Sequence, residues 1–422
     1  MQFVGAGSRP YYNPLTFCNA ALQLQKPFLF VAVNYRLGAL GFFHSSSAPT
    51  LVPENNGLHD QLTALSWIKQ NISGFGGDVD NITVIGQSAG AESISLQSLS
   101  TKLDPVPYQK AIMFSGTPVT MPSKTPQEHE ENFLEQAEKL EIKTKGKSST
   151  EIAEEMIKMD VSKIRELSFV GAPCSSSTTL PYTKPTMSLA QSGSPKNPTW
   201  AKSQIISATT YDGGISYNMT SSDSSRKDHG KVFSKIIKDA LSPSQATRLS
   251  EIYNMKEDDP DPLALQKICQ FESDIGFINA AVSLANGGRA EKTYFQLFDL
   301  GNPFEGPLEK GKFATHTWDI VALLGAFEEG LSEEYKSVIK KWREKIIRYI
   351  CNGEDVCAEW DGEKGKYLLV DREGVNGDEG FWNGEVGQRI SRLRDLAKDV
   401  GGDEGADFLW EGVGRRFLMK GE

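Results

Sequence analysis

Runs of consecutive apolar residues are the clearest pattern along the chain. Residues 27–34, 81–86 and 110–115 are largely apolar and too short for helices, as expected for strands that are buried on both faces of a parallel sheet. Residues 58–71 and 89–99 instead repeat apolar positions with the helical period. Strands and helices that alternate in this way predict right-handed crossovers and an α/β core, with helices on both faces of the sheet.

A different pattern occupies residues 122–198. Charged amphipathic helices are predicted in its first part, and a loop rich in Ser, Thr and Pro follows. We interpret this segment as a helical cap insertion in the core. Strand character returns at residues 204–209 and 292–298, with helices predicted between and after them. Because no repeat and no linker divides the chain, residues 1–422 are predicted to form a single domain.

Composition and charge restrict the partners of this protein. With 45 Lys and Arg against 55 Asp and Glu, the net charge of −10 would repel phosphate backbones and anionic lipid surfaces, so nucleic acid is not expected as a partner. No apolar run approaches the roughly 20 residues that cross a bilayer, and the first thirty residues lack the pattern of a signal peptide. An integral membrane span is therefore not predicted, whereas secretion and a cytoplasmic location both stay open.

The cysteines do not define a disulfide framework, because five is a small and odd number for this length. Cys351 and Cys357 are near enough in sequence to close a small loop or to contribute to a metal site. No histidine and no second cysteine pair stands close to them in the sequence, so two free thiols are the preferred interpretation.

Residues 86–90, Gly-Gln-Ser-Ala-Gly, match the pattern G-x-S-x-G between a predicted strand and a predicted helix. A sharp strand-to-helix turn exposes the serine oxygen, which a weak nucleophile requires. Ser88 is therefore predicted to be a nucleophile, with Gly86 and Gly90 at the positions where strand and helix approach closely. The amide of Ala89, at the start of the helix, can donate to a developing oxyanion.

Longer blocks around this motif resemble the type-B carboxylesterases and lipases, the family that includes the cholinesterases. Residues 75–90 are similar to the serine signature of that family, residues 33–43 and 56–71 to blocks upstream of it, and residues 111–116 to the strand that follows. The resemblance implies an α/β-hydrolase fold with a central, mostly parallel sheet, and a small-molecule ester as the substrate. Gln87 stands where cholinesterases carry Glu, so the prediction does not extend to choline esters.

The resemblance also implies an acid and a histidine, in that order, after the serine. Residues 207–213 are in the frame of the family's acid motif, with Asp212 at the acid position, although a plain Asp-Gly turn is a competing interpretation. Aspartate is able to orient an imidazole as the more usual glutamate does. His316 is in the frame of the family's catalytic histidine. The order Ser88, Asp212, His316 is that of α/β-hydrolases.

The other four histidines fit the role of base less well. His44 and His59 lie in upstream blocks at positions where the family has no catalytic histidine. His129 and His229 lie in charged segments that we expect at the surface.

One element of the family has no counterpart in this sequence. Family members have a strand that ends in a His-Gly-Gly-Gly type loop ahead of the region matched by residues 5–14, and that loop supplies further oxyanion donors. Loss of one such donor typically costs about 3 to 4 kcal/mol. We therefore expect the chain to be truncated at the N-terminus, with Met1 an internal methionine of a longer reading frame. One missing strand would belong between the strand of residues 28–34 and the strand before Ser88.

Together these features predict a serine hydrolase that cleaves carboxylic esters through an acyl-enzyme intermediate, with no cofactor and no metal ion. Two alternatives stay open. One is a non-catalytic relative that uses the fold for binding, and the other is a truncated, inactive product. Neither the acyl and alcohol groups of the substrate nor the oligomeric state follows from the sequence.

Overall fold

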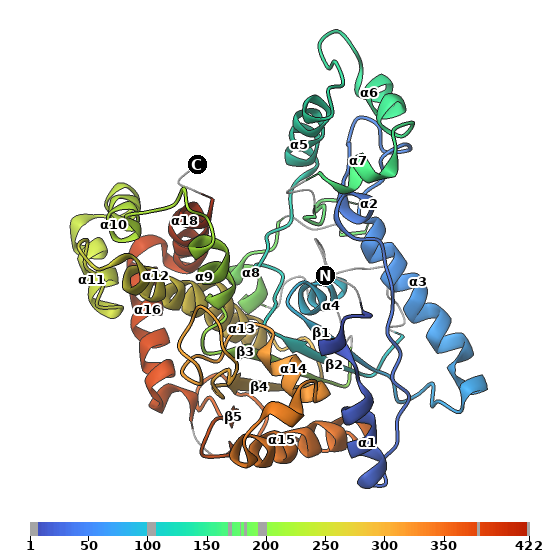
Figure 1. Ribbon diagram of the computed structural model, residues 1–422, viewed down its shortest axis with the longest axis vertical. Helices are drawn as coiled ribbons and strands as arrows, with labels where there is room; N and C mark the ends of the chain where they lie inside the picture. The colour runs from blue at the N-terminus through green and yellow to red at the C-terminus, as the bar shows by residue number, and fades with distance from the viewer. Residues whose placement is uncertain are drawn as a thin grey trace.

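A six-stranded sheet is the centre of the structure, a computed structural model that describes residues 7–98, 107–167, 171–177, 179–180, 184–192, 201–377 and 380–419 (Figure 1). The strand order is β1-β2-β3-β4-β5-β6, in which β1 to β5 are parallel and β6 is antiparallel to β5. Each parallel connection crosses over through at least one helix. The strands are β1 (Thr83–Gln87), β2 (Lys110–Phe114), β3 (Ser203–Thr209), β4 (Lys292–Phe298), β5 (Leu368–Val370) and β6 (Val375–Asn376).

Four of the predicted strands are confirmed. The apolar runs at residues 81–86, 110–115, 204–209 and 292–298 correspond to β1, β2, β3 and β4. Every residue of β2 and β3 is buried, because these strands have neighbours on both sides and helices over both faces. The predicted α/β core with a mostly parallel sheet is therefore correct.

Residues 27–34, in contrast, form no strand, so this prediction is wrong. Leu29, Phe30 and Val31 are 49%, 38% and 47% exposed. An apolar run indicates a preference for burial, but a strand also needs a neighbour that satisfies its backbone groups. In the described part of the chain β1 pairs with β2 alone, and residues 27–34 stay outside the sheet.

Alternate side chains of the strands point to two layers of helices. Ile112 and Phe114 of β2 belong to the apolar cluster on one face, whereas Ala111 and Met113 belong to the cluster on the other face. The first layer contains α1 (Leu15–Gln23), α14 (Trp318–Leu324) and α15 (Glu333–Asn352). The second layer contains α4 (Ala89–Gln97), α8 (Met187–Ser192), α13 (Ala280–Asn286) and α16 (Glu385–Gly401).

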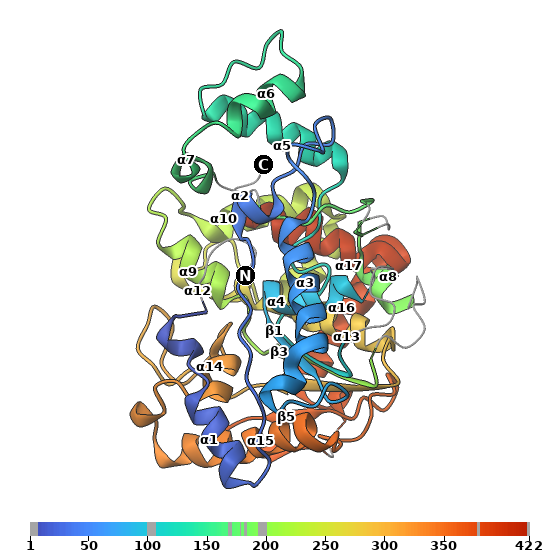
Figure 2. The same cartoon turned by 90° about the vertical axis from the view of Figure 1, so that its right-hand side faces the viewer.

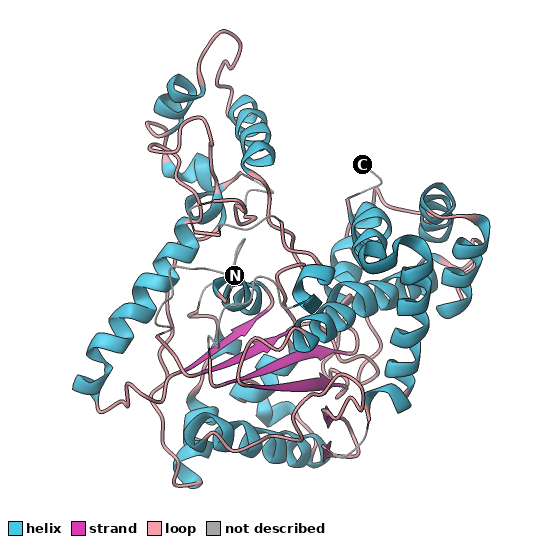
Figure 3. Cartoon of the chain, turned by 180° about the vertical axis from the view of Figure 1, so that it is seen from behind, coloured by secondary structure: helices cyan, strands magenta, loops and turns pink. Residues whose placement is uncertain are grey.

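A further group of helices lies beside the sheet, on the left of Figure 1 and on the right of Figure 3. It has its own apolar cluster, in which Phe233, Phe271 and Trp410 are buried. The group contains α9 (Gly214–Ser221), α10 (His229–Ala240), α11 (Pro243–Ile252), α12 (Asp261–Glu272), α17 (Gly405–Phe408), α18 (Arg416–Leu418) and the π-helical segments η3 (Ser273–Asn279) and η7 (Leu409–Arg415).

The segment that we interpret as an insertion contains three helices that extend away from the sheet (Figures 1 and 2). They are α5 (Pro126–Lys139), α6 (Ser149–Met156) and α7 (Val161–Arg165). Capping boxes with Thr125 and Ser148 at the N-cap begin α5 and α6. Phe133 of α5 packs against Phe43, at a ring-centroid distance of 5.6 Å, next to α2 (Gly38–Phe42) and α3 (Asn56–Asn71). Parts of the predicted insertion, including residues 193–200, lie outside the described residues.

Short helical turns complete the structure. They are η1 (Pro10–Tyr12), η2 (Ile72–Phe75), η4 (Glu328–Gly330), η5 (Phe381–Asn383) and η6 (Gly402–Glu404). None of the helices in the described residues is both long and apolar enough to span a bilayer.

Candidate active site

Ser88 lies in the sharp turn between β1 and α4. Its backbone is at φ 55° and ψ −124°, a strained conformation for a residue with a side chain. Two hydrogen bonds hold this conformation: the Ser88 amide donates to the Phe114 carbonyl at 2.8 Å, and the Ser88 carbonyl accepts from the Glu92 amide at 2.9 Å. The predicted strand-to-helix turn is thus present, and Ser88 is partly exposed at its tip.

Close backbone packing around this turn depends on two glycines. A Cβ on Gly86 would overlap the backbone of Gly90, and a Cβ on Gly116 would overlap the Ser88 carbonyl. A Cβ on Gly90 itself would have no atom within 4 Å. The prediction that close approach requires glycine at both ends of the motif is therefore correct for Gly86 and wrong for Gly90. Gly116, which the motif does not include, has the role instead.

Asp212 and His316 come together at the carboxyl ends of β3 and β4. His316 Nδ1 is 2.7 Å from Asp212 Oδ1, and the Thr209 amide donates to Asp212 Oδ2 at 2.9 Å. Asp212 is fully buried and the His316 side chain is only 5% exposed. A bridge between Tyr211 and Thr315 aligns the two segments. Two residues that are far apart in the sequence thus form a buried acid and imidazole pair, as an orienting acid requires.

Gln87, the residue before Ser88, contacts the other nitrogen of the imidazole. Its Nε2 is 3.2 Å from His316 Nε2, whereas no hydrogen bond joins the Ser88 hydroxyl to His316 in the described structure. The Gln87 amide can donate to Nε2 when the ring proton is on Nδ1 and directed to Asp212. The predicted acid and base are thus brought together, and the predicted nucleophile is adjacent to them without a direct link.

Ala89 is the first residue of α4, and it is buried. The amides of a first helical turn have no partner inside the helix, so the Ala89 amide is free to donate to a ligand. The oxyanion role of Ala89 stays a prediction.

Asp319 is a buried acid near this site that no sequence motif identified. It lies in the first turn of α14, three residues after His316, and its Oδ2 accepts a long hydrogen bond of 3.4 Å from the Ser115 hydroxyl. Burial raises the pKa of Asp319 to about 7, and the charge of Asp212 adds to this rise. A charged residue three positions after the candidate base, in an otherwise apolar helix, was the sequence feature that could have identified Asp319.

The π-helical segment η3 lines the site on another side. The Phe277 ring packs edge-on against His316 at a centroid distance of 5.5 Å. Ser273 accepts a hydrogen bond of 2.8 Å from the Gly213 amide, next to Asp212. Segments of π-helix are rare and are frequent at functional sites. No pattern in the sequence predicted η3.

The remaining histidines lie elsewhere, but two of them are not where the sequence predicted. His129 and His229 are 1% and 5% exposed rather than at the surface. Each lies on the inner face of an amphipathic helix, so the charged neighbours in the sequence were misleading. Burial lowers the pKa of His129 to about 4. His59 forms a hydrogen bond of 2.8 Å with Thr179.

All five cysteines are free thiols in the structure, Cys351 and Cys357 among them. No disulfide joins Cys351 to Cys357 in the structure, and the interpretation of this pair as two free thiols stays a prediction.

Comparison with known proteins adds an independent finding. The profile of the Carboxylesterase family matches residues 2–356. The para-nitrobenzyl esterase of Bacillus subtilis (strain 168) is 45% identical over 119 residues, which are 28% of this chain and 23% of that protein. The bile salt-activated lipase of Mus musculus is 51% identical over 83 residues, 20% of this chain and 12% of that protein. Cholinesterase 1 of Branchiostoma lanceolatum is 44% identical over 98 residues, 23% of this chain and 27% of that protein. In these alignments the chain spans no more than 27% of a relative's length.

Proposed function

The chain belongs to the Carboxylesterase family, and we propose that it hydrolyses carboxylic esters of small molecules through a serine-bound acyl-enzyme. Ser88 is the nucleophile, His316 the general base, and Asp212 the acid that orients the base. The observation that supports this proposal most is the 2.7 Å hydrogen bond between His316 and the buried Asp212, next to the turn that carries Ser88.

The proposed reaction begins at the imidazole. His316 donates a hydrogen bond from Nδ1–H to Asp212, so that Nε2 is unprotonated and can act as a base. The Ser88 oxygen attacks the ester carbonyl while its proton passes to Nε2, and the alcohol leaves with that proton as the C–O bond breaks. Water then attacks the acyl-enzyme by the same route and releases the carboxylic acid. The Ala89 amide and the positive end of α4 stabilise the oxyanion in both steps.

Gln87 adds one requirement to this reaction. Since its amide is 3.2 Å from His316 Nε2, the Gln87 side chain must turn away before that nitrogen can accept the Ser88 proton. Catalytic hydrogen bonds are often long or poorly aligned before substrate binds. Substrate binding is therefore the step at which we expect Gln87 to release the imidazole.

The same contact favours a second candidate function, in which the chain binds esters without turning them over. If Gln87 stays on His316 Nε2, the base is not available to Ser88, and the site keeps only the capacity to bind an ester. This is the non-catalytic alternative that the sequence left open.

Hydrolysis of p-nitrophenyl acetate by the purified chain separates the two functions. We expect turnover by the unmodified protein and no turnover above background by Ser88→Ala. The control variant Ser222→Ala removes an exposed serine instead and should retain the turnover. A fluorophosphonate probe should label one site on the unmodified chain and none on Ser88→Ala. Equal rates for the unmodified protein and Ser88→Ala, together with stabilisation of both by an ester analogue, would instead support binding without catalysis.

A further inference from the structure

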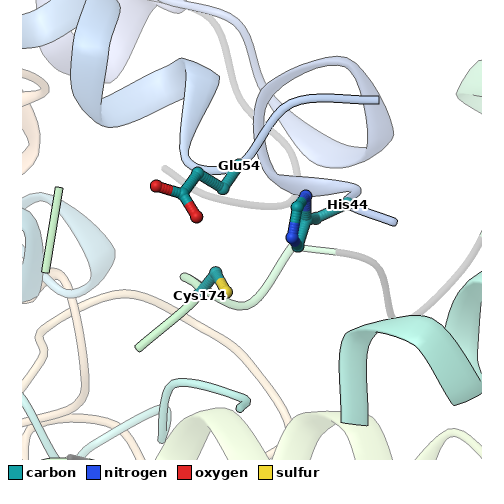
Figure 4. A group of neighbouring side chains, drawn as sticks. All are labelled: His44, Glu54 and Cys174. Carbon is teal, nitrogen blue, oxygen red and sulfur yellow. The ribbon is translucent and has the colours of Figure 1, made fainter. Parts of the chain in front are cut away.

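A second group of chemically reactive side chains lies outside the candidate active site. His44, Glu54 and Cys174 each offer one ligand atom, and these atoms are all within 4.8 Å of one another (Figure 4). His44 follows α2, Glu54 precedes α3, and Cys174 follows α7 in the chain. His44 and Cys174 are buried, and Glu54 is partly buried. The sequence pattern did not reveal this group, because Cys174 is far from the other two residues along the chain.

The ring of His44 is held in the orientation that a metal ligand needs. Its Nδ1 is 2.9 Å from the carbonyl oxygen of Val52, so Nδ1 carries the proton and donates it to that carbonyl. Nε2 then keeps a free lone pair. Histidines that bind metal ions usually fix their tautomer by such a hydrogen bond from the other ring nitrogen.

The backbone of Cys174 is fixed by two hydrogen bonds to the Asn55 side chain. The Asn55 side chain accepts a hydrogen bond of 2.7 Å from the Cys174 amide and donates one of 2.9 Å to the Cys174 carbonyl. Asn55 is fully buried, directly follows Glu54, and has a left-handed backbone at φ 52°. An isolated parallel β-bridge also pairs Cys174 with Lys124. The positions of Glu54 and Cys174 are thus coupled through one buried amide side chain.

The charges of the three side chains suit a divalent cation, because a thiolate, a carboxylate and a neutral imidazole around a charge of +2 sum to zero. A neutral cluster is the arrangement that a buried site tolerates best.

The chemistry of the donors selects the kind of cation. Nitrogen, sulfur and a carboxylate oxygen are the ligands of Zn²⁺, whereas Mg²⁺ and Ca²⁺ prefer oxygen alone. Three protein ligands leave one tetrahedral position for water. A further imidazole, that of His129, lies beside the group, with its ring centroid 5.7 Å from that of His44.

We propose that His44 Nε2, the Glu54 carboxylate and the Cys174 sulfur bind one Zn²⁺ ion. On binding, the S–H bond of Cys174 breaks, its proton leaves to solvent, and the sulfur forms a bond to the metal with no change of oxidation state. The ion joins the segment that follows α5 to α7 to the loop between α2 and α3, so it stabilises the attachment of these helices to the rest of the structure. This site is independent of the proposed ester hydrolysis.

Titration of the untagged, metal-free chain with Co²⁺ tests the proposal, since Co²⁺ reports a thiolate ligand by a charge-transfer band in the near ultraviolet. We expect one equivalent to bind with that band, Zn²⁺ to displace it, and Zn²⁺ to raise the melting temperature. Cys174→Ser should abolish the band, while Cys18→Ser, a thiol in α1 outside the group, should keep it. Absence of the band in the folded chain, or its persistence in Cys174→Ser, overturns the proposal.

Two further variants keep the test decisive if Cys174→Ser does not fold, as judged by circular dichroism. His44→Gln and Glu54→Gln each remove one ligand and retain similar size. Both should weaken Co²⁺ binding by more than the roughly 10- to 100-fold that loss of an outer-shell partner causes. Unchanged Co²⁺ affinity in these two variants shows that the cation binds elsewhere and overturns the proposal.

Discussion

The Gln87 amide nitrogen lies 3.2 Å from His316 Nε2, so the neighbour of the proposed nucleophile contacts the proposed base. The other ring nitrogen is bonded to Asp212, and Nε2 is therefore the nitrogen that Ser88 has to reach. We expect Gln87→Ala to remove a competitor and to raise kcat/KM by about 2- to 10-fold, the equivalent of one ordinary hydrogen bond. Steady-state hydrolysis of p-nitrophenyl acetate measures the change. A lower kcat/KM at unchanged melting temperature would contradict it.

Gln87→Glu should act differently, because it places a negative charge beside the imidazole. A carboxylate stabilises the protonated ring, so a higher pH is needed to generate the base. The acid limb of the kcat/KM profile is expected to move to higher pH in Gln87→Glu, with Gln87→Ala as the uncharged control. If the two profiles coincide, residue 87 does not face His316 in the working enzyme.

The hydrogen bond that His316 donates to Asp212 should matter far more for rate than for stability. Asp212→Asn can still accept from the Thr209 amide, but it no longer favours the productive tautomer of His316. Loss of the corresponding acid in serine proteases lowers kcat by about 10⁴-fold, and a similar loss is expected here. Asp299→Asn, at a largely buried carboxylate that bonds Thr210, is the matched control and should retain kcat within about tenfold. Similar losses in both variants would argue against a special role for Asp212.

Asp319 should make the free energy of unfolding depend on pH. Its pKa of about 7 in the folded chain exceeds the unfolded value of about 4, so its contribution is present below about pH 4 and is lost as pH rises through 7. The wild type is therefore expected to lose on the order of 2 to 3 kcal/mol between pH 5 and 8 that Asp319→Asn does not lose. Urea unfolding at the two pH values measures this difference.

An exposed carboxylate provides the control for this measurement. Asp403→Asn, in η6, should leave the pH dependence as in the wild type. Equal slopes in the wild type and Asp319→Asn would show that the buried carboxyl does not titrate in this range.

Gly116 and Gly90 should differ in their sensitivity to the same substitution. A methyl group at Gly116 would overlap the Ser88 carbonyl, so Gly116→Ala has to displace the turn and is expected to destabilise the fold by about 3 kcal/mol or more. Gly90→Ala has open space and should change stability by less than about 1 kcal/mol. Melting temperatures of the two variants test the contrast. Comparable destabilisation of both would mean that backbone contact at Ser88 is not the constraint.

The strands β1 to β4 are predictable because parallel strands covered on both faces need apolar side chains at nearly every position. Residues 27–34 have the same composition and form no strand. Composition reports a preference for burial and carries no information on whether a neighbouring strand is present to receive the backbone hydrogen bonds.

The histidines show a second limit of prediction from the sequence. His129, Phe133 and Ala137 are spaced by four residues and are all buried on one face of α5. The four-residue spacing is visible in the sequence and would have predicted burial of His129. The many charged residues on the opposite face of α5 led instead to a prediction of exposure. The contacts of Gln87 and Gly116 join segments distant in the chain, and no local spacing predicts them.

The position of β1 in the sheet has a dynamic consequence. In the described residues β1 has a neighbour on one side, whereas β3 and β4, which precede Asp212 and His316, have neighbours on both. Local opening requires fewer broken hydrogen bonds at an outer strand than at an inner one. Fluctuations should therefore displace Ser88 more than Asp212 and His316. We therefore expect the separation of Ser88 from His316 to vary more than the separation of Asp212 from His316.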